Sequence, residues 1–345
     1  MRTIRDCNVA VVGGAGFLGS HLTNHLIKDR NCHVLVIDNL VAGRREFVPD
    51  RAEFVHHDIT GSEVRLRDVF SAFKTNYVFN YAAWPYIPDS FARPLYVCDV
   101  NFMGAVKVIN AAQEAGADGI LQVSSAEIYG EGSIIHIEDF DTRKMIDEKV
   151  EEGKKLGEDT PVVPHSSYGA SKAAVDSYVQ VAWKERRTPC IALRQFNCIG
   201  ERETHPYVVP EIINQLSRFL PGQIPTVMLG NNSFRDFLYA GDQARIAVQL
   251  LEKGQWGEVY NLGSERGIKV YDLAELIGKL MGFAEVQVEV DESRKRPWEI
   301  WSLLADNTKI NQAIGPYMTV TTLGEGLRRT IKWFESNGRR WPWER

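Results

Sequence analysis

Two side chains with complementary chemistry lie four residues apart at the start of a predicted helix. They are Tyr168 and Lys172, in the run SSYGASK, and helical geometry places both on one face of the helix, one turn apart. A tyrosine has a pKa of about 10, and a neighbouring ammonium stabilises the phenolate and lowers that pKa. This spacing therefore predicts a base that takes the proton of a hydroxyl group.

A serine hydroxyl is predicted to join this pair. Ser124 and Ser125 close a strand predicted over 120–124, and the helix that carries Tyr168 is predicted over 168–187. At the end of that strand, a hydroxyl can hydrogen-bond the same substrate oxygen that the tyrosine deprotonates. The Tyr-x-x-x-Lys spacing is frequent by chance, so the prediction of a catalytic site depends on the serines at the end of the preceding strand.

A turn suited to a phosphate group lies near residue 14. An apolar strand over 9–12 and an amphipathic helix over 17–28 are joined by a glycine-rich turn. Glycine lets the backbone bend tightly and lets a pyrophosphate approach the main chain, while the N–H groups at the helix start favour the anion. A purely structural tight turn is the alternative interpretation. The glycines are Gly13, Gly14, Gly16 and Gly19.

An acidic residue follows at the spacing that a dinucleotide-binding fold needs. A second strand is predicted over 33–37 and ends in Asp38-Asn39-Leu40, about twenty residues after the glycines. A carboxylate at this place hydrogen-bonds the adenosine ribose and favours NAD over NADP. An aspartate that only caps the turn after the strand is the alternative. The order of strand, glycine turn, helix, strand and acid favours ribose binding.

The apolar runs indicate an α/β fold with a doubly wound parallel sheet, in which ligands bind at the carboxyl ends of the strands. We expect a Rossmann-type NAD-binding domain over 1–200, completed by a sixth strand over 190–196. A smaller mixed α/β substrate-binding domain is expected mainly over 201–345, with segments free to return to the first domain. The other predicted strands span 53–57, 77–81, 227–229, 259–262 and 286–290, and the other helices 94–115, 208–219, 241–252, 270–281 and 323–335.

The composition argues against several classes of protein. Of 345 residues, 44% are hydrophobic and 25% are charged, as in an ordinary globular protein. The net charge of -5 argues against nucleic acid as the main partner. No apolar run approaches a membrane span, no signal-peptide pattern precedes the first strand, and five scattered cysteines suggest neither a disulfide nor a metal framework. We therefore expect a cytoplasmic protein that binds neither a membrane nor a metal.

A charged stretch over 131–164 is longer than a usual connection between elements. It holds ten acidic and five basic residues, and this difference of five equals the net charge of the whole chain. We interpret it as a solvated helical excursion. An active-site lid and an oligomer contact are the alternatives.

Taken together, the motifs resemble those of the extended short-chain dehydrogenase/reductases that act on nucleotide sugars. The resemblance covers nearly the whole chain and implies a Rossmann-type fold. In chain order, its motifs are GGAGFLG, the Asp38-Asn39-Leu40 strand end, Asp58-Ile59, Asn80-Tyr81-Ala82-Ala83, SSAEIYG, YGASK, RDFLYAGD, YNLG and RPWEI followed by AD.

This resemblance implies a cofactor, a substrate class and a set of site residues. The cofactor is NAD, the substrate is a nucleotide-diphosphate sugar, and the active form is a homodimer. The implied catalytic residues are Ser125, Tyr168 and Lys172, and the implied substrate-binding residues are Asn197, Val209, Arg235 and Arg296. NAD is implied to bind Gly13, Gly16, Phe17, Leu18, Gly19, Asp38, Asn39, Asp58, Ile59, Ala82 and Lys172.

The resemblance also implies a reaction that begins at C4 of the sugar. Hydride passes from C4 to NAD⁺ while Tyr168 takes the O4 proton, and the resulting ketone acidifies C5. Epimerases then turn the ketosugar and return the hydride to its other face. Dehydratases expel water from C5 and C6, and decarboxylases lose a C6 carboxylate as carbon dioxide.

Glu127 is the position that separates these outcomes. The 4-epimerases of the family usually carry an uncharged residue there, whereas dehydratases and decarboxylases carry a glutamate, whose carboxylate can abstract the C5 proton. We therefore favour a 4,6-dehydratase-like reaction with Glu127 as a catalytic residue, ahead of 4-epimerisation and then decarboxylation. Dehydratases acting on dTDP-glucose also carry an aspartate, the acid for the leaving hydroxyl, where this chain has Ala126. This difference weakens the hypothesis of a simple dTDP-glucose dehydratase. An exposed or helix-capping acid is the alternative for Glu127.

Other features depart from the family pattern. The segment 198–207 differs from the usual sequence after the sixth strand and borders the expected sugar pocket, and Trp298-Glu299 replaces the commoner Gly-Asp.

An NAD-sensing regulator without catalysis is the non-enzyme alternative, but such regulators usually lose the tyrosine or the lysine. The exposed-looking tail Trp341-Pro342-Trp343 is expected to pack on the domain surface.

Overall fold

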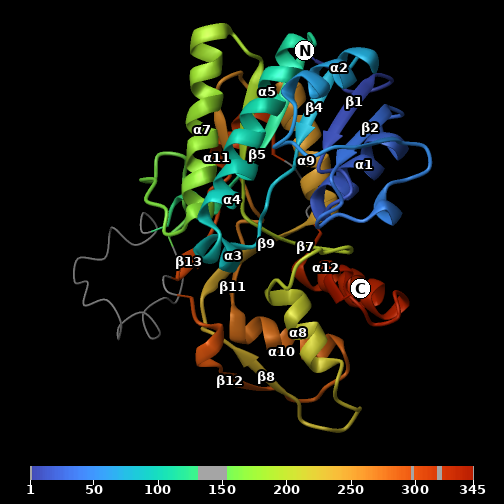
Figure 1. Cartoon of the computed structure of the whole chain (residues 1–345). Helices are drawn as coiled ribbons and strands as arrows, with labels where there is room; N and C mark the ends of the chain where they lie inside the picture. The colour runs from blue at the N-terminus through green and yellow to red at the C-terminus, as the bar shows by residue number, and fades with distance from the viewer. Residues whose placement is uncertain (1, 131–153, 297–298, 317–320, 345) are drawn as a thin grey trace.

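The structure is a computed structural model that describes residues 2–130, 154–296, 299–316 and 321–344. The upper half in Figure 1 is built on seven parallel strands, in the order β10-β6-β5-β4-β1-β2-β3. This is the strand order of doubly wound dinucleotide-binding folds, so the predicted fold class is confirmed. The strands are β1 (Asn8–Val12), β2 (His33–Asp38), β3 (Glu53–His56), β4 (Tyr77–Asn80), β5 (Gly119–Ser125), β6 (Cys190–Gln195) and β10 (Val259–Leu262).

Helices cover both faces of this sheet because successive residues of a strand point to opposite sides. In β1, Val9 and Val11 belong to one apolar core, and Ala10 and Val12 belong to the other. The first core is covered by α1 (Phe17–Lys28), α9 (Ala240–Lys253) and α11 (Thr308–Ile314), and the second by α2 (Glu63–Ala72), α5 (Ala105–Glu114) and α7 (Ser167–Arg186).

The sheet continues beyond the sixth strand. The prediction that the strand over 190–196 completes the first domain is wrong, because β10 pairs in parallel with β6 and adds a seventh strand. Helix α9 leads toward β10 and helix α11 contacts it, so late parts of the chain lie in this half of the molecule. A short apolar strand carries no mark of the sheet to which it belongs, which is why the sequence did not place it.

The helix predicted over 94–115 is divided by a wider turn. The structure has α4 (Pro94–Cys98), a π-helical segment η2 (Asp99–Gly104) and then α5. By length and composition this composite helix could cross a membrane, so the expectation that no apolar run approaches such a span is wrong by that measure. Half of its most apolar window is buried inside the molecule, and a helix packed among neighbours passes the same test.

The lower half in Figure 1 is smaller and mixed. Strand β9 (Phe234–Tyr239) is its centre and pairs with β7 (Asn197–Ile199), β11 (Gly267–Lys269) and β13 (Ser302–Leu303). A separate parallel pair consists of β8 (Thr226–Leu229) and β12 (Gln287–Val290). A third apolar core joins β7, β8, β9, β11 and β12 to α8 (Val208–Leu216), α10 (Val270–Leu280) and α12 (Leu323–Ser336).

The C-terminal tryptophans do not form an exposed tail. Trp341 is completely buried, and its ring stacks on Phe334 of α12 at 5.0 Å between centroids and on Trp343 at 5.3 Å. The exposed-looking character expected for this segment is therefore wrong for Trp341, which is part of the third core. The charged residues around it in the sequence concealed its burial.

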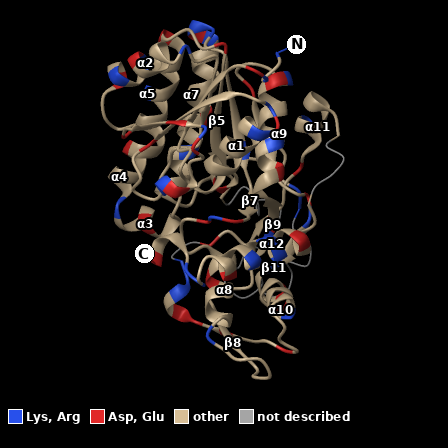
Figure 2. Cartoon of the chain, turned by 90° about the vertical axis from the view of Figure 1, so that its right-hand side faces the viewer, with Lys and Arg blue, Asp and Glu red and all other residues tan. Residues whose placement is uncertain are grey.

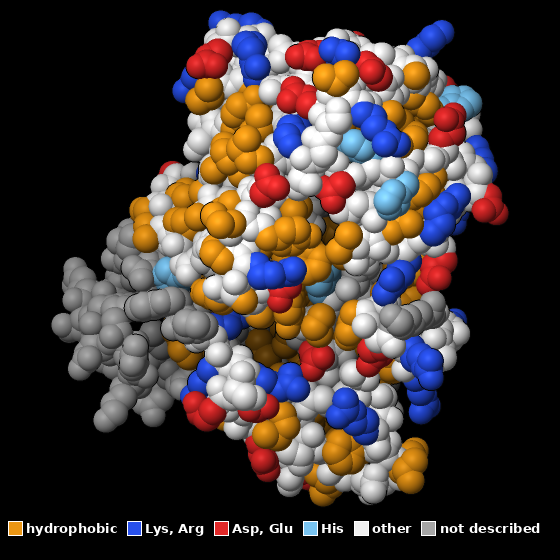
Figure 3. Space-filling view, in the orientation of Figure 1, with side chains coloured by type: hydrophobic (Ala, Val, Ile, Leu, Met, Phe, Trp, Pro, Cys, Tyr) orange, Lys and Arg blue, Asp and Glu red, His pale blue; other side chains and the backbone are white. Residues whose placement is uncertain are grey.

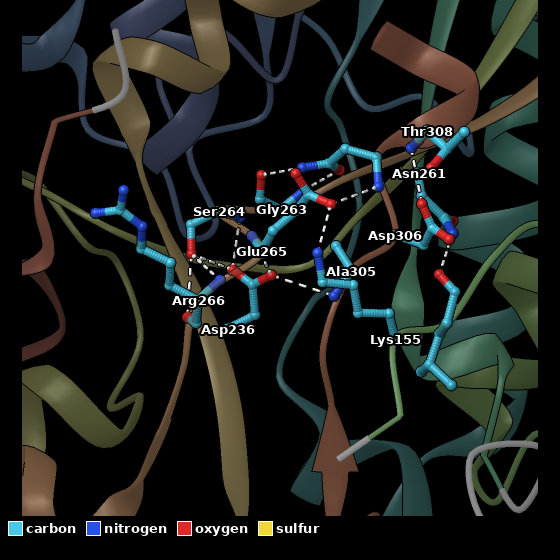
Figure 4. A network of polar contacts seen from close by, with 12 residues as sticks. Lys155, Asp236, Asn261, Gly263, Ser264, Glu265, Arg266, Ala305, Asp306 and Thr308 are labelled. Carbon is cyan, nitrogen blue, oxygen red and sulfur yellow. Dashed lines mark hydrogen bonds and ion pairs between the residues drawn. The ribbon is translucent and has the colours of Figure 1, made fainter. Parts of the chain in front are cut away.

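A buried polar network joins the two halves (Figure 4). The carboxylate of Asp236, on β9, accepts hydrogen bonds from the backbone N–H groups of Ser264 (2.6 Å), Glu265 (2.9 Å) and Ala305 (3.2 Å). Ser264 and Glu265 follow β10 of the large sheet, and Ala305 precedes α11. Because one carboxylate satisfies backbone groups from both connections, it fixes β9 against the large sheet.

Three sequence-based expectations concern charge, the acidic stretch and cysteine. In Figure 2 the positions of basic and acidic residues are interspersed along the ribbon of the described chain. The proposed helical excursion over 131–164 falls mainly on residues 131–153, which lie outside the described residues.

The five cysteines are free thiols, but Cys7 Sγ and Cys32 Sγ lie 3.9 Å apart, a proximity that their separation in the sequence did not suggest.

Candidate active site

A cavity of about 770 Å³ lies between the two halves, at the carboxyl ends of the parallel strands. In Figure 3 the surface is hollowed between the halves, with apolar side chains in the hollow. Of the residues that the sequence assigns to the site, Asp58 does not line this cavity. Those that do are Gly13, Gly16, Phe17, Leu18, Gly19, Asp38, Asn39, Ile59, Ala82, Ser125, Glu127, Tyr168, Lys172, Asn197, Val209, Arg235 and Arg296.

At one end of the cavity, close backbone contacts shape the glycine turn. Gly13 has a φ of +79°, in the left-handed region, and a Cβ there would lie 2.6 Å from the backbone nitrogen of Ala82. A Cβ on Gly19 would collide with the carbonyl oxygen of Gly13. Gly16 is the N-cap of α1, and no described side chain caps this helix start, so its N–H groups are open to an anion.

Asp38 supports this turn and still faces the cavity. Its carboxylate accepts hydrogen bonds from the backbone N–H groups of Ala15 (3.0 Å) and Leu40 (2.8 Å). Burial raises the pKa of Asp38 above its usual value. Each carboxylate oxygen accepts more than one hydrogen bond, so ribose hydroxyls can still bind. Together with the open helix start and the Cβ-free turn, this donor and acceptor set fits the adenosine and pyrophosphate parts of NAD.

Asp58 acts one layer behind the cavity wall. It accepts hydrogen bonds from Asn39 Nδ2 and from the backbone and hydroxyl of Thr60, each at 2.8 Å. Burial raises the pKa of Asp58, but these hydrogen bonds together lower it by more, so its pKa lies below the usual value. Its geometry is that of a residue that orients Asn39, whose side chain and the adjacent Ile59 do line the cavity.

The predicted triad comes together at the carboxyl end of β5. Ser125 Oγ accepts a hydrogen bond from the backbone N–H of Glu127 (3.2 Å), and its interaction with the Tyr168 hydroxyl works to lower the pKa of that tyrosine. Lys172 Nζ donates to the carbonyl of Val123 (3.1 Å) and lies 5.9 Å from the centre of the Tyr168 ring. The spacing on α7 thus brings the lysine beside the tyrosine, as the sequence predicts.

Burial changes the proton affinity of both residues. It raises the pKa of Tyr168 to about 12 and lowers that of Lys172 to about 8. Asp176, one turn further along α7, works against the shift of Lys172 and forms an ion pair with Arg194 at 2.7 Å. A charged Lys172 favours the phenolate form of Tyr168, so the protonation of the lysine decides how readily the tyrosine acts as a base.

Glu127 faces the same cavity from the turn that follows β5. Among the described residues, none donates a hydrogen bond to its carboxylate, so it forms no helix cap there. Burial raises its pKa above the usual value, and the positive charges of Arg296 and Arg235 oppose this rise. A cavity-lining carboxyl with a raised pKa, close enough to Tyr168 to affect its pKa, is suited to exchanging a proton with a bound molecule.

Two arginines reach the opposite end of the cavity, with a carboxylate between them. Glu299 accepts from Arg235 Nη2 (2.9 Å) and from Asn231 Nδ2 (2.8 Å), and its carboxylate lies 3.7 Å from Arg296 Nη1. Arg235 precedes Asp236 on β9, so the strand directs one side chain into the cavity and the other into the polar network. A diphosphate bound by these arginines must share them with Glu299.

The remaining substrate-binding candidates also lie in the wall. Val209, in the first turn of α8, supplies apolar surface, and the Oδ1 atom of Asn197 has no hydrogen-bond partner among the described residues. Trp298, the other departure in the Arg296 motif, lies outside the described residues.

Several residues of the wall were not assigned to the site from the sequence, although the segment 198–207 was expected to border the sugar pocket and parts of it do line the cavity. Glu203, His205 and Tyr207 line the cavity, and the rings of Trp84 and Tyr86 pack against His205 at 5.3 and 5.9 Å. The departure over 198–207 was a signal for the first three, because it marked the border of the sugar pocket. Trp84 and Tyr86 follow a strand end, where aromatic residues more often pack in the core, so no sequence signal set them apart.

Comparison with known proteins places this geometry in a family. The model of the NAD dependent epimerase/dehydratase family matches residues 9–263. The dTDP-D-glucose 4,6-dehydratase of Mus musculus is 29% identical over 344 residues, covering 96% of this chain and 90% of the mouse protein.

Solved structures of epimerases share the fold. The UDP-glucose 4-epimerase of Thermus thermophilus in complex with NAD is 27% identical, with a TM-score of 0.79 and coverage of 95% of this chain and 99% of that one. The UDP-glucose 4-epimerase of Thermotoga maritima with UDP-glucose is also 27% identical, with a TM-score of 0.80 and coverage of 96% and 99%. These findings confirm the resemblance seen in the motifs and NAD as the cofactor: the chain belongs to the NAD dependent epimerase/dehydratase family.

Proposed function

We propose that this enzyme oxidises a nucleotide-diphosphate sugar at C4 and then removes the proton at C5, as a 4,6-dehydratase does. NAD, when bound, accepts the hydride from C4 and later returns it. Tyr168 takes the O4 proton, Ser125 hydrogen-bonds the same oxygen, and Lys172 holds the charge that favours the tyrosinate.

The observation that supports the C5 step is the place of Glu127. Its carboxyl lines the cavity without a hydrogen bond from any described residue, two residues from Ser125 and within the electrostatic reach of Tyr168. Ketone formation at C4 makes the C5 proton acidic, and a carboxylate beside it can then act as the base. A raised pKa brings Glu127 closer to the working pH, where a general base is most effective.

The two ends of the cavity supply the binding sites for this reaction. The glycine turn and Asp38 would hold the cofactor, and Asn197, Arg235 and Arg296 would hold the diphosphate of the substrate. Arginine pairs well with phosphate oxygens because its planar donors match them. The reacting sugar then lies between these ends, against Ser125 and Tyr168.

Isotope incorporation tests the C5 step. In deuterium oxide, turnover of the correct sugar should place deuterium at C5 of the product, and in ordinary water the loss of water should lower the product mass by about 18 units. Glu127→Gln should stop product formation while the absorbance of reduced nicotinamide still appears after sugar is added. The control is Glu201→Gln, a carboxylate that does not line the cavity. An unchanged mass without deuterium, and normal turnover by Glu127→Gln, would contradict this proposal.

A 4-epimerase is the second candidate. It is favoured by Ala126, a buried residue that offers no acid for a leaving hydroxyl where dTDP-glucose dehydratases carry an aspartate. The epimerase relatives described above add to this support. Decarboxylation of a uronate sugar is the third candidate and would lower the mass by about 44 units.

We also propose that the enzyme works as a homodimer. Leu95, Met103 and Val181 are apolar and exposed by 86%, 45% and 42%, and they lie on α4, η2 and α7, which pack against one another. Apolar side chains grouped on adjoining helices are typical of a surface that another subunit covers. Light scattering after size-exclusion chromatography should give a mass of two chains, and Leu95→Lys should lower it to one.

A further inference from the structure

Glu203 is a buried acid in the wall of the cavity that the proposed reaction does not use. It lies between β7 and α8, is completely inaccessible to solvent, and is part of the cavity lining. Its Oε1 atom accepts one long hydrogen bond, from the backbone N–H of Gly200 at 3.4 Å. Its Oε2 atom has no hydrogen-bond partner among the described residues.

No described cation neutralises this carboxyl. The carboxyl interacts electrostatically with the Cys198 thiol and the Tyr207 hydroxyl, and these two half-buried residues also line the cavity. Tyr168, Tyr86 and Glu203 all raise the pKa of Tyr207 electrostatically. Glu203 therefore lies on the same side of the cavity as the proposed base, Tyr168.

The cavity wall next to Glu203 is aromatic. His205 contacts Trp84 edge-on at 5.3 Å, stacks on Tyr86 at 5.9 Å and packs against Tyr207 at 5.7 Å between ring centroids. Burial lowers the pKa of His205 to about 4, so it is a neutral ring at neutral pH. Glu203 is therefore an isolated polar group at the edge of a largely apolar wall.

A buried carboxyl without partners is expensive, because it loses its hydration and gains nothing in return. Burial raises the pKa of Glu203 well above its usual value, and the neutral acid can both donate and accept a hydrogen bond. An apolar side chain of the same size would fill this place at lower cost. A molecule in the cavity that supplied the missing hydrogen bond would remove this energetic penalty.

We propose that Glu203 binds a hydrogen-bond donor on the sugar ring of the substrate and thereby selects the sugar. The donor is a hydroxyl or an amino group, while the aromatic wall covers an apolar face of the ring. This inference rests on the proposed function, since it requires a nucleotide sugar in the cavity. Glu203 is a specificity-determining residue at a position where the sequence departs from the pattern of the family.

Calorimetric binding to the NAD-loaded enzyme tests this role with ligands that contain or lack the sugar. UDP-glucose, dTDP-glucose and UDP-glucosamine carry it, whereas UDP and dTDP do not. Glu203→Leu should raise the Kd of the preferred nucleotide sugar about tenfold, the effect of losing a buried hydrogen bond, and leave the Kd of the free nucleotide unchanged. If UDP-glucosamine shows the larger loss, the donor is an amino group, and if UDP-glucose or dTDP-glucose does, it is a hydroxyl.

Thermal unfolding separates selection from a structural role. Because Glu203→Leu removes an unsatisfied polar group, it should raise the Tm by about 2–4 °C, and NAD released from the denatured variant should match the wild type. Glu201→Gln is the matched control: Glu201 accepts the Tyr239 hydroxyl at 2.9 Å, does not line the cavity, and should leave sugar binding unchanged.

Four results would overturn the inference. They are an equal loss of affinity for nucleotide and nucleotide sugar, a lower NAD content, a lower Tm, and an unchanged Kd for every sugar ligand. A wild-type enzyme that binds no nucleoside diphosphate at all would instead overturn the proposed function, and this inference with it. The measurements on Glu203 are independent of the mass and deuterium readouts for Glu127, so the two failures are distinguishable.

Discussion

Two regions of the cavity are built by different means: the glycine end, formed by the turn after β1 and Asp38, and the reaction end, the region between that turn and the arginines that is lined by Ser125, Glu127, Tyr168, Lys172 and Glu203. At the glycine end, the backbone itself forms the surface, with Gly13 pressed against Ala82 and the Asp38 carboxylate satisfied by two backbone N–H groups. At the reaction end, ionisable side chains form the surface: the pKa of Glu127 is raised, and Glu203 Oε2 has no hydrogen-bond partner within the described part of the chain. The glycine end therefore satisfies its buried polar groups within the chain, whereas the reaction end offers polar atoms to a bound molecule, as proposed above.

The largest expected effect falls on activity at the reaction end. Tyr168→Phe removes the base and should lower kcat by about 10²- to 10⁴-fold, while NAD content and Tm stay close to those of the wild type. Tyr178→Phe on the same helix is the control, because its hydroxyl binds Asn110 at 2.6 Å away from the cavity. Steady-state kinetics on the identified sugar measure this difference, and a Tyr168→Phe enzyme with most of its activity would refute the assignment.

At the glycine end, a substitution should lower stability and cofactor binding together. Gly13→Ala combines a left-handed φ with a Cβ only 2.6 Å from a backbone atom, and should lower the free energy of unfolding by about 1–3 kcal/mol or more. Gly116→Ala has a similar φ of +80° with open space around the Cβ, and should cost about 1 kcal/mol. Urea unfolding and NAD content measure both. Equal effects of the two variants would show that the contact with Ala82 has no energetic role.

At the reaction end, the lowered pKa of Lys172 can be tested through the pH dependence of stability. Its pKa falls from an ordinary 10.5 to about 8 in the folded protein, so between these values the unfolded chain binds more protons and this group makes stability rise with pH. Lys172→Met lacks the buried ammonium and should be the more stable protein at neutral pH. Its Tm advantage should shrink as the pH rises from about 8 to 10.5. A constant Tm difference over this range would mean that Lys172 keeps its ordinary pKa.

The smallest effect is expected where a carboxylate shares the two arginines. Glu299→Gln removes a negative charge beside Arg235 and Arg296 and should strengthen binding of UDP or dTDP by about 3- to 10-fold, the size of a charge interaction of roughly 1 kcal/mol. Calorimetry at low and high salt should show a steeper salt dependence in the variant. Weaker binding by Glu299→Gln would instead mean that this carboxylate holds Arg235 in position.

The sequence predicted residues that local geometry positions far better than residues that depend on contacts between distant segments. Gly13, Asp38, Tyr168 and Lys172 act through local geometry, because a tight turn, a strand end and one helical turn fix their positions. Glu203 depends on contacts between distant segments, and an acid in a polar loop usually lies at the surface.

The same distinction explains the errors in the fold. Helix α1 lies over Phe17–Lys28 as its periodicity indicates. The pairing of β10 with β6, the π-helical turn in the helix after Arg93 and the burial of Trp341 arise from packing between remote parts of the chain. No pattern within a short window encodes them.

The return of β10 to the large sheet has a consequence for how the molecule folds and how it can be divided. A fragment cut after residue 200 would lose β10 and α9, leaving β6 as an open edge whose unpaired backbone groups invite aggregation. Neither half is therefore a module, and the chain should unfold in one cooperative transition. Engineering of a new sugar preference is better directed at the short segment 200–207 than at exchange of the whole lower half between relatives.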